Sequence, residues 1–257
     1  MRIKLGRPDI DTYRSRFDVP AAGEGLSVTF AGVSTLLIDD GTTAVLTDGF
    51  FSRPGLLRVG LGRLAPDTRR IDAALQRLGA GSRVAAVVPV HAHYDHAMDS
   101  AVVAERAGAT LVGGTSVANV GRGHGLPAER IDVVSSGDSR TYGDFTFTWV
   151  ESAHCPPDRF PGTIDEPLVT PAKTAAYKCG EAWSILVEHA SGRPALVQGS
   201  AGFVAGSLAG RVAEVAYLGI GQLGVQDPDY IRTYWAETVE TVGARAVVLT
   251  HWDDFFR

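Results

Sequence analysis

Three histidines and one aspartate fall within six consecutive positions of the chain, at His91, His93, Asp95 and His96. Imidazole and carboxylate together suit zinc, iron, manganese or nickel, so these residue types predict a metal site without fixing the metal. A single histidine is usually explained by an ordinary hydrogen bond. Four such groups this close together favour metal binding instead.

Two further histidines and one aspartate occupy comparable places. His154 follows the strand-like run FTFTWVESA, His251 follows RAVVLT, and Asp48 ends AVLTD. Open α/β sheets place their sites beyond the carboxyl ends of their strands, so we expect these side chains to converge with the histidine-rich turn. The remaining two of the seven histidines, His124 and His189, lie in turn-like segments and are expected to play no part.

The segments that carry these groups alternate between strand and helix patterns. Strands are predicted within 26–50, 83–90, 109–114, 130–152, 182–200, 212–221 and 244–251, and helices over 71–79, 99–108, 115–125 and 227–243. Asp99 or Ser100 is expected to cap the second helix. Residues 51–70 are predicted to form a loop, because glycine and proline punctuate them.

Two groups of strands, each followed by helices, predict an α/β fold. We expect a four-layer αββα sandwich of two packed mixed β-sheets with helices outside, formed by residues 1–257 as a single domain. Residues 1–25 are polar and are expected to form an N-terminal surface segment. Residues 155–180 are rich in proline and directly follow His154, so they are predicted to be an active-site loop.

The composition limits the classes of partner. The chain has 257 residues, 45% of them apolar, and a formal net charge of −5 with lysine and arginine scattered singly. Without a basic stripe, a nucleic-acid partner is not expected. No apolar run approaches the roughly 20 residues of a membrane span. The N-terminus does not look like a signal peptide, and we expect a cytoplasmic protein with reduced cysteines.

Taken together, the chemistry-bearing residues resemble the signature of the metallo-β-lactamase fold superfamily, over nearly the whole chain. The resemblance rests on seven residues in the family's order: Asp48, His91, His93, Asp95, His96, His154 and His251. The local sequences are most similar to the branch of the ascorbate-6-phosphate lactonases and N-acyl-phosphatidylethanolamine phospholipase D enzymes. Where that branch commonly has GHAT, AGDTGY and HWGTF, this chain has GVST, QGSAGF and HWDDF.

The resemblance implies two adjacent metal sites, with Asp48 orienting a ligand by a hydrogen bond. By position, the first metal would be bound by His91, His93 and His154, and the second by Asp95, His96 and His251. Three neutral histidines and a water form a complete zinc site of the open, catalytic type. Zinc is therefore expected at the first site, with manganese or iron as alternatives.

Ser200 stands where the family usually has an aspartate that bridges both metals. Two divalent ions 4 Å apart repel by roughly 16 kcal/mol at an effective dielectric of 20, and a neutral hydroxyl offsets little of this. We therefore predict one firm metal and a second that is weak or absent, in which case Asp95 is free to act as a general base. Alternatively, Asp253 or Asp254 replaces the missing charge.

The resemblance predicts a metal-dependent hydrolase, in which a metal-bound hydroxide attacks an ester, lactone or phosphodiester of a small-molecule substrate. Val33 stands where the branch has a histidine, which argues against transferring lactonase or phospholipase activity directly. The Ser200 substitution motivates an alternative from another class. In that alternative the chain is a catalytically impaired metal-binding protein that binds or senses a ligand.

Two segments are expected to border the substrate. Lys173, Tyr177 and Lys178, in the predicted active-site loop, are candidates to contact an anionic substrate. Residues 55–66, GLLRVGLGRLAP, are apolar enough to form another wall of the pocket or a contact in a homo-oligomer.

Overall fold

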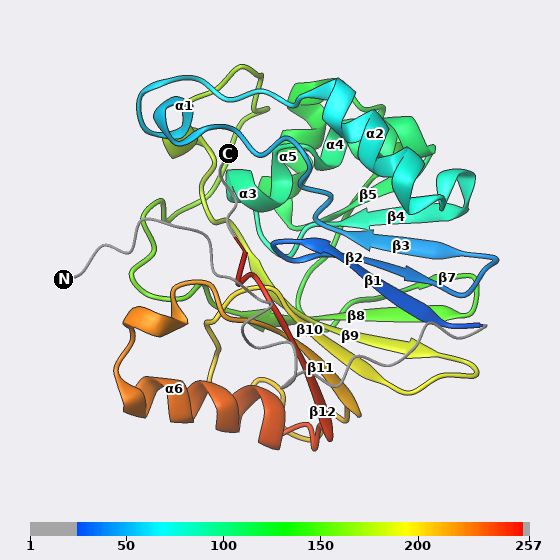
Figure 1. The fold of residues 1–257 in the computed structure, drawn as a ribbon, viewed down its shortest axis with the longest axis vertical. Coiled ribbons are helices and arrows are strands. Elements are labelled where there is room, and N and C mark those ends of the chain that lie inside the picture. The colour runs from blue at the N-terminus through cyan, green and yellow to red at the C-terminus, as the bar shows by residue number, and fades with distance from the viewer. Residues whose placement is uncertain (1–24, 254–257) are drawn as a thin grey trace.

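The computed structural model describes residues 25–253 and arranges them in two six-stranded mixed sheets (Figure 1). The first sheet has the strands in chain order: β1 (Ser27–Gly32), β2 (Thr35–Asp39), β3 (Ala44–Thr47), β4 (Val84–Val88), β5 (Thr110–Gly113) and β6 (Ile131–Val133). Strands β1 to β3 pair antiparallel, and β3 to β6 pair parallel.

The second sheet has the strand order β12-β11-β10-β9-β8-β7. Its members are β7 (Ser139–Tyr142), β8 (Phe145–Ser152), β9 (Ala182–His189), β10 (Ala195–Gln198), β11 (Val215–Gly219) and β12 (Ala246–Thr250). Strands β7 to β10 pair antiparallel, and β10 to β12 pair parallel. The two sheets thus each join an antiparallel part to a parallel part.

The side chains of the first sheet alternate between two buried layers. Leu37 and Leu46 belong to a cluster shared with the helices, whereas Leu36, Ile38 and Val45 belong to a cluster shared with the second sheet. This alternation follows from the two-residue period of a strand. Because both faces are apolar, the sheet is covered on both sides.

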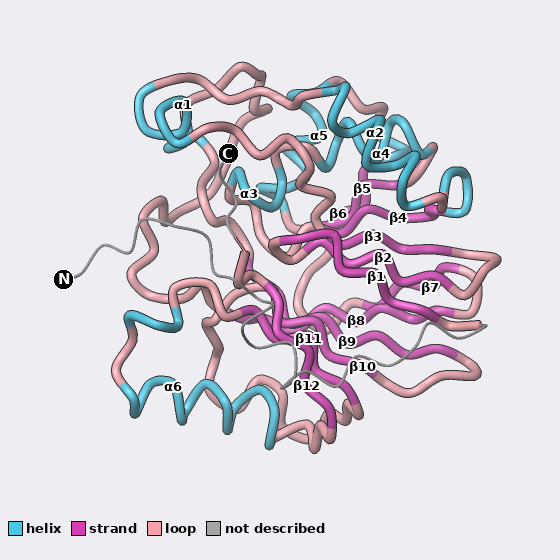
Figure 2. Tube along the Cα trace, in the orientation of Figure 1, coloured by secondary structure: helices cyan, strands magenta, loops and turns pink. Residues whose placement is uncertain are grey.

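The α-helices of the described residues are α1 (Leu56–Leu61), α2 (Thr68–Leu78), α3 (Tyr94–Ala97), α4 (Ser100–Ala107), α5 (Thr115–His124) and α6 (Pro228–Trp235). Figure 2 shows α2, α4 and α5 outside the first sheet and α6 outside the second. The α6 residue Tyr234 packs in a third cluster with Leu196 and Leu218 of the second sheet. The predicted four-layer αββα sandwich is confirmed.

The expected loop over 51–70 is wrong in part, because residues 56–61 form α1. The run Leu-Leu-Arg-Val favours a helix, and glycines stand at both its boundaries. Gly55 is the N-terminal boundary residue, and the N–H of Gly62 donates to the carbonyl of Arg58 at 2.8 Å.

Asp99 occupies the position before α4, as expected, but its carboxylate does not cap the helix. One of its oxygens accepts from the N–H groups of Phe51 (2.8 Å) and Ser52 (2.6 Å), and the other accepts from the Ser52 hydroxyl (2.7 Å). This buried carboxylate therefore fixes the start of the segment that leads to α1, rather than satisfying a helix end.

Three further expectations concern the N-terminal segment, membrane spans and the cysteines. The predicted surface segment over 1–25 lies, except for its last residue, outside the described residues. Among the described residues, no helix combines the length and apolar character needed to cross a membrane. Both cysteines are buried and unpaired with each other.

The long loop between β8 and β9 is fixed against α5. The N–H of Leu168 donates to the carbonyl of Asn119 at 2.9 Å, and the side-chain amide of Asn119 donates to the carbonyl of Ile164 at 2.6 Å. A Cβ atom added at Gly123 would lie 2.0 Å from the Leu168 carbonyl oxygen. The absence of a side chain at this helical position therefore lets the loop approach the helix.

Replacing Gly123 by alanine tests this packing, with Gly60 of α1 as the matched control. Gly123→Ala is expected to lower the free energy of unfolding by about 1–3 kcal/mol, because the methyl group meets loop backbone. Gly60→Ala meets no atom within 4 Å and is expected to raise it by up to about 1 kcal/mol, because alanine favours helix. Urea unfolding measures both. Stabilisation by both substitutions would mean that the loop does not pack on α5.

Candidate metal centre

The histidine-rich turn directly follows the buried strand β4. His91 lies in the turn, and His93 is the boundary residue that begins α3. The carbonyl of His93 accepts from the N–H groups of His96 (3.0 Å) and Ala97 (2.8 Å), which closes one helical turn. This short helix places Asp95 and His96 next to each other, beside the two earlier histidines.

Strand ends bring in the other predicted residues. Asp48 follows β3, His154 follows β8, and His251 follows β12. The ring nitrogens of His91, His93 and His154, hereafter the first triad, lie within 4.8 Å of one another. His91 Nε2 and His93 Nδ1 are 3.1 Å apart.

Asp95, His96 and His251, hereafter the second triad, form an equally tight group within 4.8 Å. Asp95 Oδ2 lies 3.5 Å from His251 Nε2 and 3.6 Å from His96 Nε2. The rings of His91 and His96 are 3.9 Å apart between centroids, so the two triads adjoin. The structure thus brings together all six residues that the resemblance assigns to the two metal sites.

Acceptor groups lie behind two of these rings. His96 Nδ1 is 2.8 Å from the buried carboxylate of Asp48, and His154 Nδ1 is 2.7 Å from the carbonyl of Cys155. Carboxylate and carbonyl oxygens only accept, so Nδ1 of each ring carries the proton. Nε2 is therefore the ring nitrogen of His96 and of His154 that is left to bind a metal.

In His93 the acceptors lie at the other ring nitrogen, Nε2. Its Nε2 lies 3.2 Å from the carboxylate of Asp158 and 3.4 Å from the carbonyl of Phe160, so Nε2 carries the proton. Its Nδ1 then presents a lone pair toward His91. The Nδ1 atom of His91 is buried without a hydrogen-bond partner among the described residues, so no acceptor holds a proton on that nitrogen.

Burial keeps the first triad neutral. It lowers the pKa of His91 well below the ordinary value of 6.5, and it lowers the pKa of His93 as well. Burial, with the charge of His93 next, lowers the pKa of His154 to about 4. All three imidazoles are therefore unprotonated on one nitrogen near neutral pH, which is the form that binds metals.

The second triad is an ionic group. Burial alone would lower the pKa of His96, but the charges of Asp48 and Asp95 outweigh burial and raise it. Burial alone would raise the pKa of Asp95, but His96 and His251 outweigh it and lower that pKa. The donor sets of both triads fit a divalent metal, and the second triad carries the only carboxylate among the six residues.

Ser200 lies beside the N–H of Cys155, which donates to its hydroxyl oxygen at 3.0 Å. The alternative source of negative charge is engaged elsewhere. Asp253 pairs with Arg53 at 2.8 Å and accepts the N–H of Val33 at 2.8 Å. Asp254, the other aspartate expected to replace the bridging charge, lies outside the described residues.

Val33, Asp48 and His251 all have left-handed backbones, with φ of 53°, 53° and 57°. This conformation is unfavourable for non-glycine residues and for β-branched valine above all. Hydrogen bonds hold it in place, since the carbonyl of Val33 accepts the N–H of His251 at 2.6 Å. Val33, buried where the branch has a histidine, thus positions His251 through its backbone.

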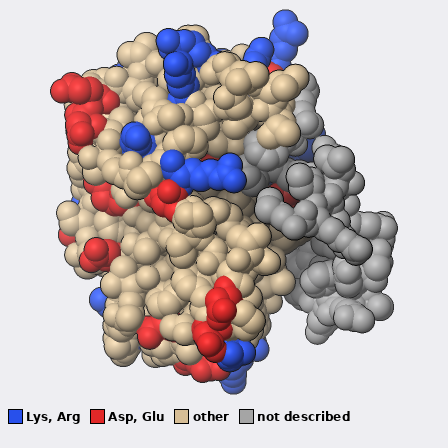
Figure 3. Space-filling model, turned by 90° about the vertical axis from the view of Figure 1, so that its left-hand side faces the viewer, with Lys and Arg blue, Asp and Glu red and all other residues tan. Residues whose placement is uncertain are grey.

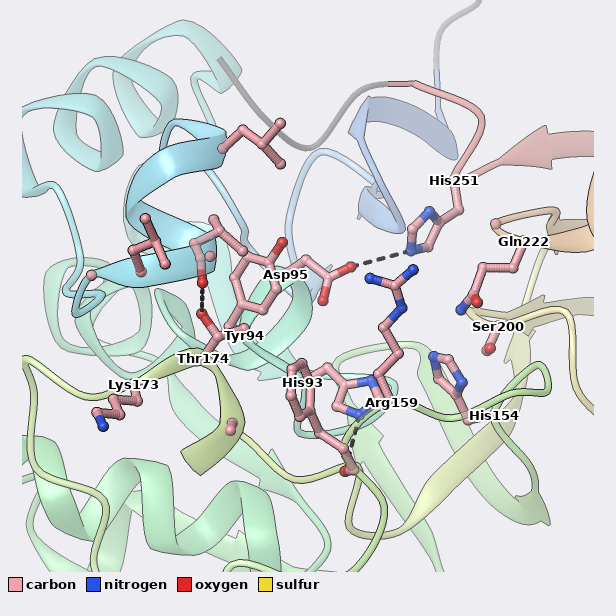
Figure 4. Close-up of a pocket in the computed structure, with 18 residues that line it drawn as sticks. His93, Tyr94, Asp95, His154, Arg159, Lys173, Thr174, Ser200, Gln222 and His251 are labelled. Atoms are coloured by element: carbon pink, nitrogen blue, oxygen red, sulfur yellow. Dashed lines mark hydrogen bonds and ion pairs between the residues drawn. The ribbon is translucent and has the colours of Figure 1, made fainter. Parts of the chain in front are cut away.

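A cavity of about 690 Å³ opens over the triads (Figure 4). His93, Asp95, His154 and His251 border it, while His91 and His96 do not. Its wall includes Leu56, Val59 and Leu61 of α1, as expected for an apolar pocket segment. Thr174 joins this wall to the loop after β8, because its hydroxyl donates to the carbonyl of Val59 at 2.6 Å.

The loop after β8 supplies different residues from those singled out in the sequence. Lys173 borders the cavity, but Tyr177 is fully buried in the core and Lys178 is half-buried away from the lining. Arg159 borders the cavity and was not predicted. The available signal was its place in CPPDRF, immediately after His154. Asp158, which lies behind His93, belongs to the same run and was not predicted either.

The remaining histidines lie outside the two triads. His124 Nε2 is 3.3 Å from Glu105 at the surface, and His189 Nε2 is 3.2 Å from Asp40. Asp144 lies within 4.8 Å of the latter pair. The Asp40 carboxylate also accepts the N–H groups of Thr42 and Thr43 in the β2–β3 turn, so it has a structural role there.

No protein-family model matches the chain, and no curated protein matches it. Solved structures do resemble it. A possible metal-dependent hydrolase from Veillonella parvula has a TM-score of 0.55 at 18% identity, covering 90% of this chain and 87% of that chain. The metallo-hydrolase Igni18 from Ignicoccus hospitalis has a TM-score of 0.53 at 15% identity, covering 88% and 82% respectively.

The metallo-β-lactamase fold protein YhfI from Bacillus subtilis has a TM-score of 0.50 at 13% identity, covering 89% of this chain and 84% of that chain. Identities this low carry information on the fold and leave the branch of the superfamily open. The layered architecture agrees with the likeness. The chain therefore has the metallo-β-lactamase fold.

Proposed function

We propose that the protein is a metal-dependent hydrolase of small-molecule esters, lactones or phosphodiesters. The observation that supports this most is the first triad, whose neutral imidazoles converge beneath a cavity, two of them with protons held on the outward nitrogens. Three histidines with an open fourth position are typical of catalytic zinc, so zinc is the proposed metal, with manganese or iron as alternatives.

A zinc ion there would act as a Lewis acid and lower the pKa of a bound water toward about 7. The residues of the chain would do the rest. Asp95 borders the cavity and is the proposed general base, which takes the proton of the attacking water and returns it to the leaving group. His96 and His251 hold the Asp95 carboxylate in place, through the contacts within the second triad.

We infer that the two triads differ in affinity. Ser200 offers a neutral hydroxyl where relatives of this fold usually place a bridging aspartate. Asp253 is neutralised by Arg53, and Asp158 lies behind His93 rather than between the triads. The repulsion between two divalent ions is therefore only partly offset, which favours one firm metal in the first triad.

Restoring the carboxylate tests this inference. Ser200→Asp is expected to raise bound zinc from about one to about two per chain, because a charge between the triads offsets the repulsion of the ions. Ser200→Asn has nearly the same shape without the charge and is expected to stay at about one. Elemental analysis at a fixed free-zinc concentration distinguishes them. Two tight zinc ions in the wild type would show that another group bridges the sites.

Asp48→Asn tests how the His96 ring is held. An asparagine has one acceptor oxygen and cannot serve both the Val90 N–H and His96. The amide NH₂ would face His96 Nδ1 and move the ring proton to Nε2. Zinc affinity at the second triad is expected to fall about 10- to 100-fold.

Calorimetric zinc titration in the Ser200→Asp background, where both sites are expected to be measurable, separates the two triads. The zinc affinity of the first triad should change by less than about threefold, since its rings donate hydrogen bonds to groups other than Asp48. Equal losses at both triads would indicate general disruption of the fold and contradict the role given to Asp48.

The hydrolase proposal itself is tested with zinc-loaded protein on ester, lactone and phosphodiester panels. Asp95→Asn is expected to lower kcat by about 10²- to 10⁴-fold while the first triad keeps its zinc, because the base is lost. Asp165→Asn, which alters an exposed acid in the loop after β8, is the control and should leave kcat unchanged. Metal-replete wild-type protein without any hydrolysis would reject the hydrolase and favour the ligand-binding or sensor alternative.

A further inference from the structure

We propose that the cavity selects esters that pair an apolar acyl chain with a carboxylate on the leaving group, and that Arg159 binds this carboxylate. The inference rests on the proposed hydrolase function and adds a substrate class to it. Two features of the cavity carry it: one arginine that forms no ion pair with a carboxylate of the described residues, and one apolar helix that borders the same space.

Arg159 is a cation available to a ligand. It borders the cavity beside His93, His154 and Phe160, and Figure 4 shows its side chain extending from the loop into the space near the triads. Among residues 25–253, no carboxylate forms an ion pair with it. By contrast, Arg53 is paired with Asp253. A guanidinium in a cavity of this kind matches a carboxylate with two parallel hydrogen bonds.

The opposite wall of the cavity is apolar. Leu56 and Leu61 of α1 border the space while remaining 61% and 90% exposed, and Val59 lies between them. Exposed leucines at a cavity rim gain contact when an apolar chain covers them. Leu57, on the same helix and 80% exposed, does not border the cavity.

The surrounding surface argues for a small anion rather than a polyanion. Figure 3 shows the cavity end of the molecule with acidic and basic side chains scattered over a mostly uncharged face. The formal net charge of −5 also disfavours a highly charged ligand. Recognition of an anion would therefore depend on a single local contact.

The arrangement fixes how such a substrate lies. In Figure 4 His154, His251 and Arg159 are on one side of the cavity and α1 is on the other. The acyl chain would follow α1, the scissile carbonyl would face the first triad, and the carboxylate would reach Arg159. A bond forms between the water oxygen and the acyl carbon, the ester C–O bond breaks, and the leaving oxygen takes the proton held by Asp95.

Matched aryl esters test the anion contact. The probes are 3-hexanoyloxybenzoate and its neutral methyl ester. Arg159→Gln is expected to lower kcat/KM for the anionic ester about 10- to 100-fold and for the methyl ester less than about threefold, because only the anion loses a charged hydrogen bond. Arg193→Gln removes a surface charge in the β9–β10 turn and should change neither. Equal losses on both esters would overturn the proposal and make Arg159 a general transition-state contact.

The chain-length preference tests the apolar wall. Leu61→Ser is expected to lower the preference for 3-hexanoyloxybenzoate over 3-acetoxybenzoate by at least about threefold, because methylene groups lose contact. Leu57→Ser is the control on the same exposed helix and should keep the preference. Equal effects of the two substitutions, or none, would overturn the assignment of α1.

A binding experiment separates this inference from the hydrolase proposal. The amide N-hexanoyl-3-aminobenzoate is titrated calorimetrically into chelator-treated protein. Arg159→Gln is expected to weaken binding at least about tenfold relative to the wild type. That result without hydrolysis of any ester keeps the subsite and rejects the enzyme. Hydrolysis of neutral esters with no Arg159-dependent binding keeps the enzyme and overturns the subsite.

Discussion

The buried carboxylate of Asp48 is the constraint on which the centre depends. One oxygen accepts the N–H of Val90 at 2.9 Å, and the other lies 2.8 Å from His96 Nδ1. The Asp48 N–H donates to the Val88 carbonyl at 3.1 Å, so the residue ties the end of β3 to the end of β4. A buried carboxylate is unfavourable unless it is hydrogen-bonded, and here both oxygens have donors. The sheet edge and the histidine-rich turn are thereby fixed to each other.

The same principle recurs around the first triad with different groups. The backbone carbonyl of Cys155 holds His154, and the Asp158 carboxylate with the Phe160 carbonyl holds His93. Each acceptor stands behind its ring and keeps the proton on the outward nitrogen. The inward nitrogens are therefore arranged as ligands by the chain itself, and binding a metal would require little reorganisation of these rings.

The fold and the convergence of the six triad residues were predictable because their signals are local and periodic. The two-residue alternation in β2 and β3 places Leu37 and Ile38 on opposite faces, which predicts a sheet buried on both sides. Donors directly after strands, such as His154 and His251, inherit their position from the sheet edge.

Irregular segments carry no such signal. In the loop after β8, nothing periodic separates the buried Tyr177 from Arg159, which borders the cavity, because packing against α5 decides which residue faces inward. The short helix α1 depends on four residues between Gly55 and Gly60, and the glycines around it predict a loop. An aspartate before a helix can cap that helix or accept hydrogen bonds from another segment. Only the tertiary structure shows that the Asp99 carboxylate accepts from Ser52.

The most direct test of the account is a long-range ¹H–¹⁵N correlation spectrum of the histidine rings in chelator-treated protein at neutral pH. The account predicts that His154 carries the proton on Nδ1 and that His93 carries it on Nε2, each as a single tautomer before any metal is added. Averaged or mixed tautomers at these two rings would contradict it, because the chain would then not prearrange the ligands of the first triad.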